Sequence, residues 1–409
     1  MNSTYRQIYR KAKELENGIT RFLLDLLAVP SHSGKEKEVV ERIATEMKQL
    51  DFDEARIDGL GNVIGRIGRG KRVLAFDAHV DTVYAGDLSQ WSFPPFQPKI
   101  EAGRIWGRGA TDQKSGLASM VYAGKLIREL ELADTLTLLF IGSVMEEDCE
   151  GLCWHYLVEK EGIKPDLVVI TEPTNLNIYR GHRGRMEIQV EIKGRSCHGS
   201  APERGDNAAY KISRIALEIE KLNGRLKTDP FLGKGSVTVS EVASSSPSLC
   251  AVPDSARLYL DRRLTFGETK ENALAEVTQA ARDAGYGDAR VTVPEYRQPS
   301  HTGLVFPFEK YFPTWTLDAK SPYLQQAIAT YQGLFERHPL VDKWTFSTNG
   351  VGIVPVYDIP CLGLGPGDEV QAHAVDESCP ITQLSAATAF YAALAAKLTM
   401  KEVEKRVRR

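Results

Sequence analysis

Histidine and acidic side chains recur directly after short apolar segments, and together they offer metal-ligating and acid–base chemistry. His79 and Asp81 follow the apolar segment 72–76. Residues two apart point to the same side of an extended chain, so the Asp81 carboxylate could accept a hydrogen bond from one imidazole nitrogen while the other nitrogen binds a metal ion. A histidine–aspartate pair with a purely structural role is the alternative for this cluster.

The segment 107–116 reads GRGATDQKSG and sets one acidic residue, Asp112, among glycines. Glycines permit unusual backbone geometry beside that acid. A phosphate-binding loop is a weaker interpretation, because the spacing is not that of a Walker loop.

Three adjacent acids, Glu146, Glu147 and Asp148, follow the apolar segment 136–141, which suits a buried strand. Burying several carboxylates is costly unless positive charge compensates them, and a metal ion would do so. Neighbouring glutamates point in different directions, so one could bind a metal while the other faces the reacting water. An exposed acidic turn is the alternative, since runs of charge usually face solvent.

Two further candidates also follow apolar or glycine-rich segments. Glu172 comes after 167–170, and His373 comes after the loop 363–367. With the residues above, they place two histidines and several carboxylates at strand ends of one α/β domain, where such sheets bind their ligands. This set, which needs no cysteine, suits a hydrolase site that holds two zinc ions.

The elements that must position these residues alternate between strands and helices. Helical spacing of apolar residues is present in 14–27, 36–50, 117–129 and 152–160, and short apolar strands are expected at 62–67, 72–76, 136–141 and 167–170. Such alternation predicts an α/β domain with a mixed, mostly parallel sheet flanked by helices.

The pattern changes after residue 179, and we expect a second domain at 181–295, inserted into the first. Apolar and polar residues alternate through 186–193, as in a strand with one wet face. Further strands are expected at 236–242, 257–261 and 290–293, with helices at 208–222 and 271–284. The α/β domain would then comprise 1–180 and 296–409, completed by helices at 323–335 and 382–398 and an apolar segment at 361–365.

Composition points to a globular protein without a polyanionic partner. The chain has 409 residues, 42% hydrophobic and 26% charged, with a formal net charge of -3. We expect neither nucleic-acid nor membrane binding, and the polar start of the chain, which lacks a signal-peptide pattern, favours the cytoplasm. The six cysteines fit reduced thiols. A zinc or redox role for Cys149 and Cys153 is disfavoured, because no second cysteine pair completes a site.

The segments HVDTV at 79–83, GRGATDQKSG at 107–116, EED at 146–148 and TEPT at 171–174 resemble one known family. It is the dinuclear zinc family of acetylornithine deacetylase, succinyl-diaminopimelate desuccinylase, carboxypeptidase G and aminoacylase, and the resemblance covers essentially the whole chain. The stretches 151–154 and 196–207 resemble its YgeY-like branch, described as selenium-metabolism-linked hydrolases. That description comes from gene neighbourhood and defines no reaction.

The resemblance implies a role for each metal-site residue. His79 and Glu172 would bind one divalent ion, Glu147 and His373 the other, and Asp112 would bridge both. Zinc is the expected metal, with cobalt or manganese as alternatives.

The resemblance also implies the acid–base residues of the site. Asp81 would orient His79, and Glu146 would act as general base and then general acid. The peptide after the bridging aspartate, Asp112–Gln113, is expected to be cis.

For the inserted domain, the resemblance implies a lid that also forms a homodimer. His198 would reach the partner subunit's active site and stabilise the oxyanion. A substrate carboxylate would be held by Arg183 and Arg263. An exposed loop histidine and surface salt bridges are the alternatives for these residues. A further loop matches a substrate-contacting loop of the family at Thr348, Asn349 and Gly350.

One position departs from the pattern. Many relatives carry an asparagine shortly before the Val-Pro of the lid strand, where this chain has Leu249 and Cys250 before Ala251. A lid contact to the substrate is therefore changed or lost, so deacetylase or desuccinylase specificity is not carried over.

The leading hypothesis is hydrolysis of an amide-type C–N bond in a small carboxylate. Candidate substrates are an N-acyl or N-carbamoyl amino acid, a dipeptide, or a product of purine breakdown. Two alternatives stay open: a non-catalytic metal-bearing module, and a dimetal enzyme of other chemistry such as a lyase.

Overall fold

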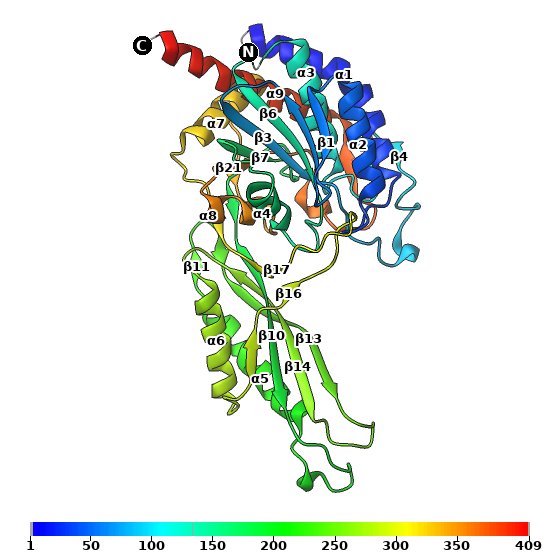
Figure 1. Cartoon of the computed structure of the whole chain (residues 1–409), viewed down its shortest axis with the longest axis vertical. Helices are drawn as coiled ribbons and strands as arrows, with labels where there is room; N and C mark the ends of the chain where they lie inside the picture. Colours follow the sequence, from blue (N-terminus) through cyan, green and yellow to red (C-terminus); the bar gives the residue numbers. More distant parts are fainter. Residues whose placement is uncertain (1–2, 133, 408–409) are drawn as a thin grey trace.

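The computed structural model describes residues 3–132 and 134–407, with the backbone alone for 400–407. The chain forms an α/β body and an elongated lid that projects from it (Figure 1). Each part has its own hydrophobic core. The expected fold class is confirmed.

Four buried parallel strands form the centre of the body. They are β6 (Leu136–Ser143), β3 (Arg72–His79), β7 (Leu167–Ile170) and β21 (Cys361–Gly363), adjacent in that order. Apolar side chains occupy both faces, as in parallel strands covered on both sides. Their carboxyl ends therefore meet at one edge of the sheet, where ligands of such sheets bind.

Shorter strands complete this mixed eight-stranded sheet. β2 pairs antiparallel with β6, and β8 pairs antiparallel with β21. The outer strands are β1 (Glu54–Ile57), β2 (Val63–Ile67), β8 (Ile178–Tyr179) and β20 (Val341–Asp342). A separate three-stranded sheet in the body comprises β4 (Lys99–Glu101), β5 (Arg104–Trp106) and β22 (Ser378–Pro380).

Helices α1 (Ser3–Leu27), α3 (Lys114–Glu129) and α9 (Ile381–Val407) pack against one another, and α3 contacts the central strands. Alanines at successive positions of α9 are buried, which allows close helix packing. The other helices of the body are α2 (Lys37–Gln49), α4 (Leu152–Glu159), α7 (Pro322–Phe335) and α8 (Val354–Tyr357), with short 3-10 turns η1 (Leu88–Gln90), η3 (Asn349–Gly352) and η4 (Glu369–Gln371). Within the described residues, no helix is long and apolar enough to cross a membrane.

The lid is an antiparallel sheet with two helices on one face. Its strands lie in the order β13 (Ser236–Ser245), β14 (Ser255–Leu264), β10 (Gly184–Lys193) and β15 (Arg290–Thr292). Alternate residues of β10 point into a core shared with α5 (Ala208–Arg225) and α6 (Lys270–Asp283). The period-two pattern of the sequence is therefore confirmed. The sheet continues past residue 295, because β18 (Tyr311–Phe312) also pairs with β10.

Short strands connect the two parts. They are β9 (Gly181–His182), β16 (Glu295–Tyr296), β17 (Phe308–Glu309) and β19 (Trp315–Thr316), and the lid also carries β11 (Thr228–Asp229), β12 (Gly233–Lys234) and the turn η2 (Pro202–Arg204). All six cysteines are free thiols. Burial raises the pKa of Cys149 and Cys153, which keeps both thiols protonated.

Candidate active site

Five predicted metal ligands meet at the carboxyl ends of the central strands. His79 ends β3, Glu147 follows β6, Glu172 follows β7 and His373 lies beyond β21. Asp112 comes from the loop before α3 and completes the cluster. Parallel neighbours thus bring together residues that are far apart in the sequence.

The five residues form two ligand groups that share Asp112. One group contains His79 and Glu172, and the other contains Glu147 and His373. The two carboxylate oxygens of Asp112 face opposite groups: Oδ1 lies 2.9 Å from His79 Nε2, and Oδ2 lies 3.4 Å from His373 Nε2. A carboxylate in this position is able to bridge two metal ions.

The donor set fits zinc or a similar divalent ion. Imidazole nitrogens and carboxylate oxygens are ligands that zinc accepts readily. His79 Nε2 lies 3.5 Å from Glu172 Oε1, and His373 Nε2 lies 2.9 Å from Glu147 Oε2. Glu172 Oε2 and Glu146 Oε1 are buried without a hydrogen-bond partner among the described residues. Such oxygens are costly in a protein interior, and bound cations would compensate them.

The electrostatics of the site show the same need for positive charge. Burial raises the pKa of Glu146 and Glu172 well above the usual range, and it raises the pKa of Glu147 to about 7. Burial opposes protonation of His79, yet the acidic groups around it, led by Glu146 and Glu172, together outweigh burial and raise the pKa of His79. The hydrogen bond to Glu147 raises the pKa of His373 to about 8. Divalent ions would replace the protons that this cluster otherwise retains.

Two buried carboxylates hold the turn that carries Glu146. Asp81 accepts hydrogen bonds from the backbone N–H groups of Glu146 and Glu147, at 3.2 and 3.0 Å. Glu36 Oε1 accepts from the N–H of Met145 at 3.1 Å. Met145 has φ 63°, a left-handed conformation that is uncommon outside glycine. Three successive amides are thus fixed, and Glu36 was not predicted from the sequence.

Asp81 contacts His79 mainly through its backbone. The Nδ1 atom of His79 lies 2.9 Å from the carbonyl oxygen of Asp81 and 3.6 Å from its carboxylate Oδ1. The carboxylate instead accepts from the hydroxyl of Ser33 at 2.6 Å as well as from the two amides. In this structure the main chain of Asp81 makes the shorter contact with His79, and orientation of His79 by the Asp81 side chain stays a prediction.

Glu377 holds the loop of the bridging carboxylate and was not predicted. Its Oε1 accepts from the N–H groups of Thr111 and Asp112, at 2.6 and 2.9 Å, and its Oε2 accepts from Gly109 at 2.9 Å. Glu377 is fully buried. The adjacent peptide Asp112–Gln113 is cis, as expected from the resemblance.

A cavity of about 350 Å³ lies over the metal-site residues, between body and lid. Arg263, for which substrate binding was predicted, lines it from the lid, and so does Arg185, which the sequence did not single out. Arg183 is not among the lining residues: its Nη1 donates to the carbonyl of Lys234 at 2.7 Å.

The three residues predicted to contact the substrate do not line the cavity, whereas the three residues before them do. Thr345, Phe346 and Ser347 line the cavity, whereas Thr348, Asn349 and Gly350 are buried behind them. The Asn349 amide donates to Asp77 and Ser143 and accepts from the N–H of Gly151. The Thr348 hydroxyl lies 3.0 Å from the His182 ring, and the Gly350 backbone packs on Trp315. These three residues support the loop in this structure, and their contact with substrate stays a prediction.

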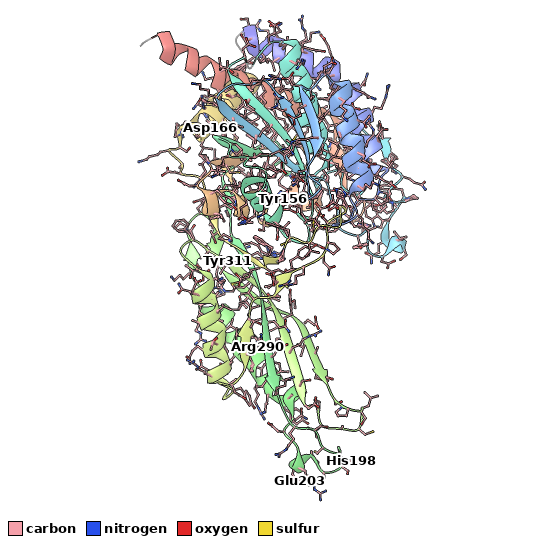
Figure 2. All side chains as sticks on the ribbon, viewed as in Figure 1. Tyr156, Asp166, His198, Glu203, Arg290 and Tyr311 are labelled. Carbon is pink, nitrogen blue, oxygen red and sulfur yellow. The ribbon has the colours of Figure 1, made fainter. Side chains whose placement is uncertain are left out.

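His198 lies at the end of the lid that is remote from the body (Figure 2). Its Nδ1 is 2.7 Å from the hydroxyl of Ser200, and its segment pairs with Ala251. Within one chain it does not join the metal-site cluster. The exposed Cys250 lies beside it, since its carbonyl accepts from the N–H of Gly199 at 2.7 Å.

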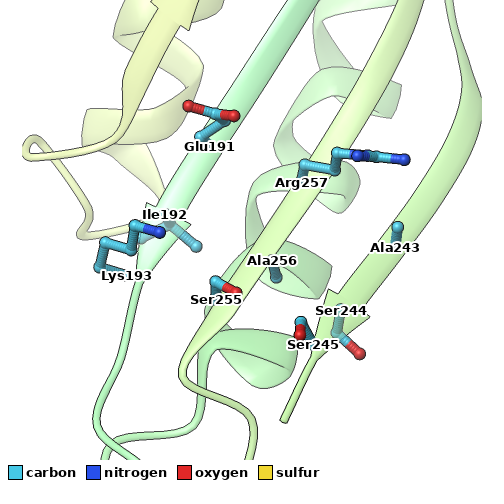
Figure 3. A pocket seen from close by; sticks show the side chains of 9 residues that line it. All are labelled: Glu191, Ile192, Lys193, Ala243, Ser244, Ser245, Ser255, Ala256 and Arg257. Atoms are coloured by element: carbon cyan, nitrogen blue, oxygen red, sulfur yellow. The ribbon is translucent and has the colours of Figure 1, made fainter.

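A second cavity, of about 310 Å³, lies on the lid between strands β10, β13 and β14 (Figure 3). Its walls include small side chains such as Ala243, Ser245 and Ala256. It contains none of the predicted site residues.

The fold and the site together define a metal-dependent hydrolase, with ligand groups suited to two ions. The defining features are the parallel strand ends, the shared carboxylate and the adjacent buried glutamate. The chain belongs to Peptidase family M20/M25/M40, whose model matches residues 75–397. It is a metallohydrolase acting on amide bonds.

The similarity to individual proteins extends over nearly the whole chain. The chain is 50% identical over 393 residues to the uncharacterized protein YgeY of Escherichia coli (strain K12), with 96% of this chain and 97% of that protein covered. It is 34% identical over 389 residues to a probable succinyl-diaminopimelate desuccinylase of Staphylococcus epidermidis, with 87% and 92% covered. The predicted family and its YgeY-like branch are confirmed.

A solved structure shows the same fold. The Bacillus subtilis YXEP protein, described as a dinuclear metal binding peptidase from the M20 family, superposes with a TM-score of 0.69 at 17% identity. The match covers 95% of this chain and 99% of that chain.

Proposed function

We propose that this enzyme hydrolyses an amide-type C–N bond in a small molecule that carries a free carboxylate, with Glu146 as the general base. One observation carries the proposal: the Asp112 carboxylate faces both ligand groups, and the buried Glu146 beside them has an oxygen without a partner among the described residues. Candidate substrates are N-acyl or N-carbamoyl amino acids, dipeptides and products of purine breakdown.

The acid–base work is assigned to Glu146. Two divalent ions bound by the five ligands would lower the pKa of a water molecule and polarise the substrate carbonyl. Glu146 Oε2 lies 3.9 Å from His79 Nε2, so the base is beside the ligands without being one of the two sets. Glu146 takes a proton from the attacking water and passes it to the leaving nitrogen. Asp81 and Glu36 keep its backbone in place for both transfers.

We assign the substrate carboxylate to Arg263, with Arg183 beside it. Asp261 holds Arg263 through Nε and Nη2, at 2.7 and 3.0 Å, so the Nη1 group keeps its donors for another partner. Arg185 is engaged by Glu150 at 2.6 Å and by Glu187 at 3.1 Å. The guanidinium of Arg263, held by Asp261 on one side, offers paired, directional donors to a carboxylate.

The metal is proposed to be zinc, with cobalt or manganese as alternatives.

The assignments that remain concern two chains and the location of the enzyme. The enzyme would act as a homodimer through the lid at 181–295, with the body formed by 1–180 and 296–409. His198 would enter the active site of the partner subunit and stabilise the oxyanion. The free thiols favour a cytoplasmic enzyme.

The test is turnover of a panel of N-acyl amino acids, N-carbamoyl amino acids and dipeptides by zinc- or cobalt-loaded enzyme. Glu146→Ala should lower kcat by about 10²- to 10⁴-fold, the range of general acid–base catalysis. Asp148→Ala is the matched control, because Asp148 is an exposed acid of the same turn. Full activity in Glu146→Ala would overturn the assignment of the base, and a wild-type enzyme inert on the whole panel would favour the non-catalytic module.

A further inference from the structure

One wall of the cavity carries a buried hydroxyl that the proposed mechanism does not use. Ser347 lines the cavity and is only 7% exposed. Its Oγ has no hydrogen-bond partner among the described residues. Burying a hydroxyl without a partner is unfavourable, so this atom is suited to a polar group of the substrate.

Glu369 lines the same cavity, beside the loop of Ser347. The only hydrogen bond of its carboxylate in the described part of the chain comes from the N–H of Thr345, at 3.4 Å. The carboxylate is half-buried and has no ion pair with any described residue. Asp342 and Asp368 add negative charge near it, while the nearby Lys343 is 3.5 Å from Asp342.

The other charged groups of the cavity already have partners or roles. Arg185 pairs with Glu150, and Arg263 pairs with Asp261. The remaining lining carboxylates are the proposed metal ligands and Glu146. Glu369 is thus the one carboxylate in the described cavity wall with neither a cationic partner nor an assigned task.

We propose that Ser347 and Glu369 form a subsite for an ammonium group of the substrate. An ammonium has three donors and no acceptor, and it would find a charged acceptor in Glu369 and a hydroxyl oxygen in Ser347. The inference rests on the proposed function and narrows it: the substrate carries an ammonium group on this wall as well as the carboxylate assigned to Arg263. A neutral hydroxyl or amide could use Ser347 but would leave the charge of Glu369 unused.

The ammonium could lie on either side of the scissile amide, and two substrate pairs distinguish the cases. Nα-acetyl-L-lysine and N-acetyl-L-norleucine differ in a cationic group on the amino-acid side. Glycyl-L-leucine and N-acetyl-L-leucine differ in an ammonium group on the acyl side. The cationic member of at least one pair should have a kcat/KM about tenfold higher, since a hydrogen bond to a charged group contributes about that factor.

The variants that test the subsite are Glu369→Gln and Ser347→Ala. Glu369→Gln should bring the ratio of kcat/KM for the cationic substrate to kcat/KM for the neutral substrate, the cationic preference, close to one. It should do so by lowering kcat/KM for the cationic substrate, while kcat/KM for the neutral substrate stays unchanged. Ser347→Ala should reduce the preference less. The matched control is Glu129→Gln, on an exposed glutamate at the end of α3, which should leave the preference unchanged.

Binding without turnover gives an independent readout. For an ammonium on the amino-acid side, L-lysine should raise the melting temperature of zinc-loaded enzyme more than L-norleucine. For an ammonium on the acyl side, glycine should raise it more than acetate. Glu369→Gln should remove the difference within the pair. Wild-type turnover with no cationic preference, or a preference that survives Glu369→Gln, would overturn the subsite while the proposed function stands. Absence of turnover on all four substrates, with the melting-temperature difference intact, would count against the proposed function and support the subsite.

Discussion

At the level of single residues, the chemistry depends on which cations and N–H groups compensate the negative charge of the buried carboxylates. Asp112 is shared by two ligand groups, and Glu377 fixes its backbone through three N–H groups. A residue that orients a metal ligand in this way affects metal affinity even though it never touches the metal.

Replacement of Glu377 by alanine should therefore weaken zinc binding by about 10- to 100-fold, the usual effect of removing a residue behind a ligand. The measurement is a zinc titration of the metal-stripped protein against a competing chelator. The exposed Asp148 supplies the control, as Asp148→Asn should bind zinc like the wild type. Wild-type affinity in Glu377→Ala would show that the loop of Asp112 holds its position without this carboxylate.

The sequence predicted the metal-site residues better than the residues that support them. His79 and Glu172 follow apolar segments, which is a local signal that patterns and family motifs both contain. Glu36, Glu377 and Ser347 have no such signal. Their roles arise from contacts with residues more than 100 positions away, or from the shape of the cavity, and no local pattern encodes either.

At the level of elements, the turn after β6 decides where the base lies. The turn 145–147 is held from two other segments: Glu36 at the start of α2 and Asp81 after β3. The left-handed backbone of Met145 persists because these contacts stabilise it.

Glu36→Ala should lower kcat by roughly 10²-fold with little change in KM, because a displacement of about 1 Å in a catalytic group has that effect. Glu36→Gln should recover most of the activity, since its amide oxygen can still accept from the N–H of Met145. Steady-state kinetics of both variants provide the check. An equal loss in kcat for the two variants, or a loss confined to KM, would contradict the positioning role.

Elements with a strong apolar pattern were predicted accurately, and short polar ones were not. β7 occupies 167–170, as predicted, because all four residues are buried. β3 extends to His79, beyond the predicted end at 76, since Asp77 interrupts the apolar run. α1 begins at Ser3 rather than at 14, because its first turns bury only Tyr5, Ile8 and Ala12 among polar residues. Two-residue strands such as β8 have no periodicity to detect.

For the whole molecule, the role proposed for His198 depends on a second subunit. His198 lies at the far end of the lid (Figure 2), whereas the metal-site residues lie at the ends of the central strands of the body. A lid that joins two chains could place this histidine in the other active site.

The test of this arrangement uses two inactive variants mixed under conditions that exchange subunits. Glu146→Ala and His198→Ala should each be impaired alone. A mixed dimer contains one intact site, with Glu146 from one chain and His198 from the other. Random exchange of equal amounts makes about half of the dimers mixed, so the mixture should regain about a quarter of the wild-type rate. No regain in dimers shown to have exchanged would exclude action across the dimer.

Removal of metal should make the stability of the whole chain depend on pH. Burial raises the pKa of Glu36 to about 8 and that of Glu147 to about 7, and it raises the pKa values of Glu146 and Glu172 well above the usual range. Between about pH 5 and 7 the folded state therefore binds more protons than the unfolded state, so stability falls as pH rises. Burial lowers the pKa of His182 to about 4 and also lowers the pKa of His155, so these two groups act in the opposite direction but are outnumbered by the four acids.

Calorimetry of metal-stripped protein should show a melting temperature at least about 5 °C lower at pH 7 than at pH 5.5, since 1 kcal/mol corresponds to a few degrees. Zinc should reduce this dependence, because it replaces the protons. A melting temperature that rises over the same interval would contradict the assigned electrostatics.

Turnover in oxygen-18 water tests the central claim most directly. Zinc-loaded enzyme is incubated with its best substrate of the panel, and the acid product is analysed by mass spectrometry. Hydrolysis with Glu146 as base predicts one labelled oxygen in the carboxylate of the product and almost no product from Glu146→Ala. Product without the label would exclude hydrolysis and favour a lyase.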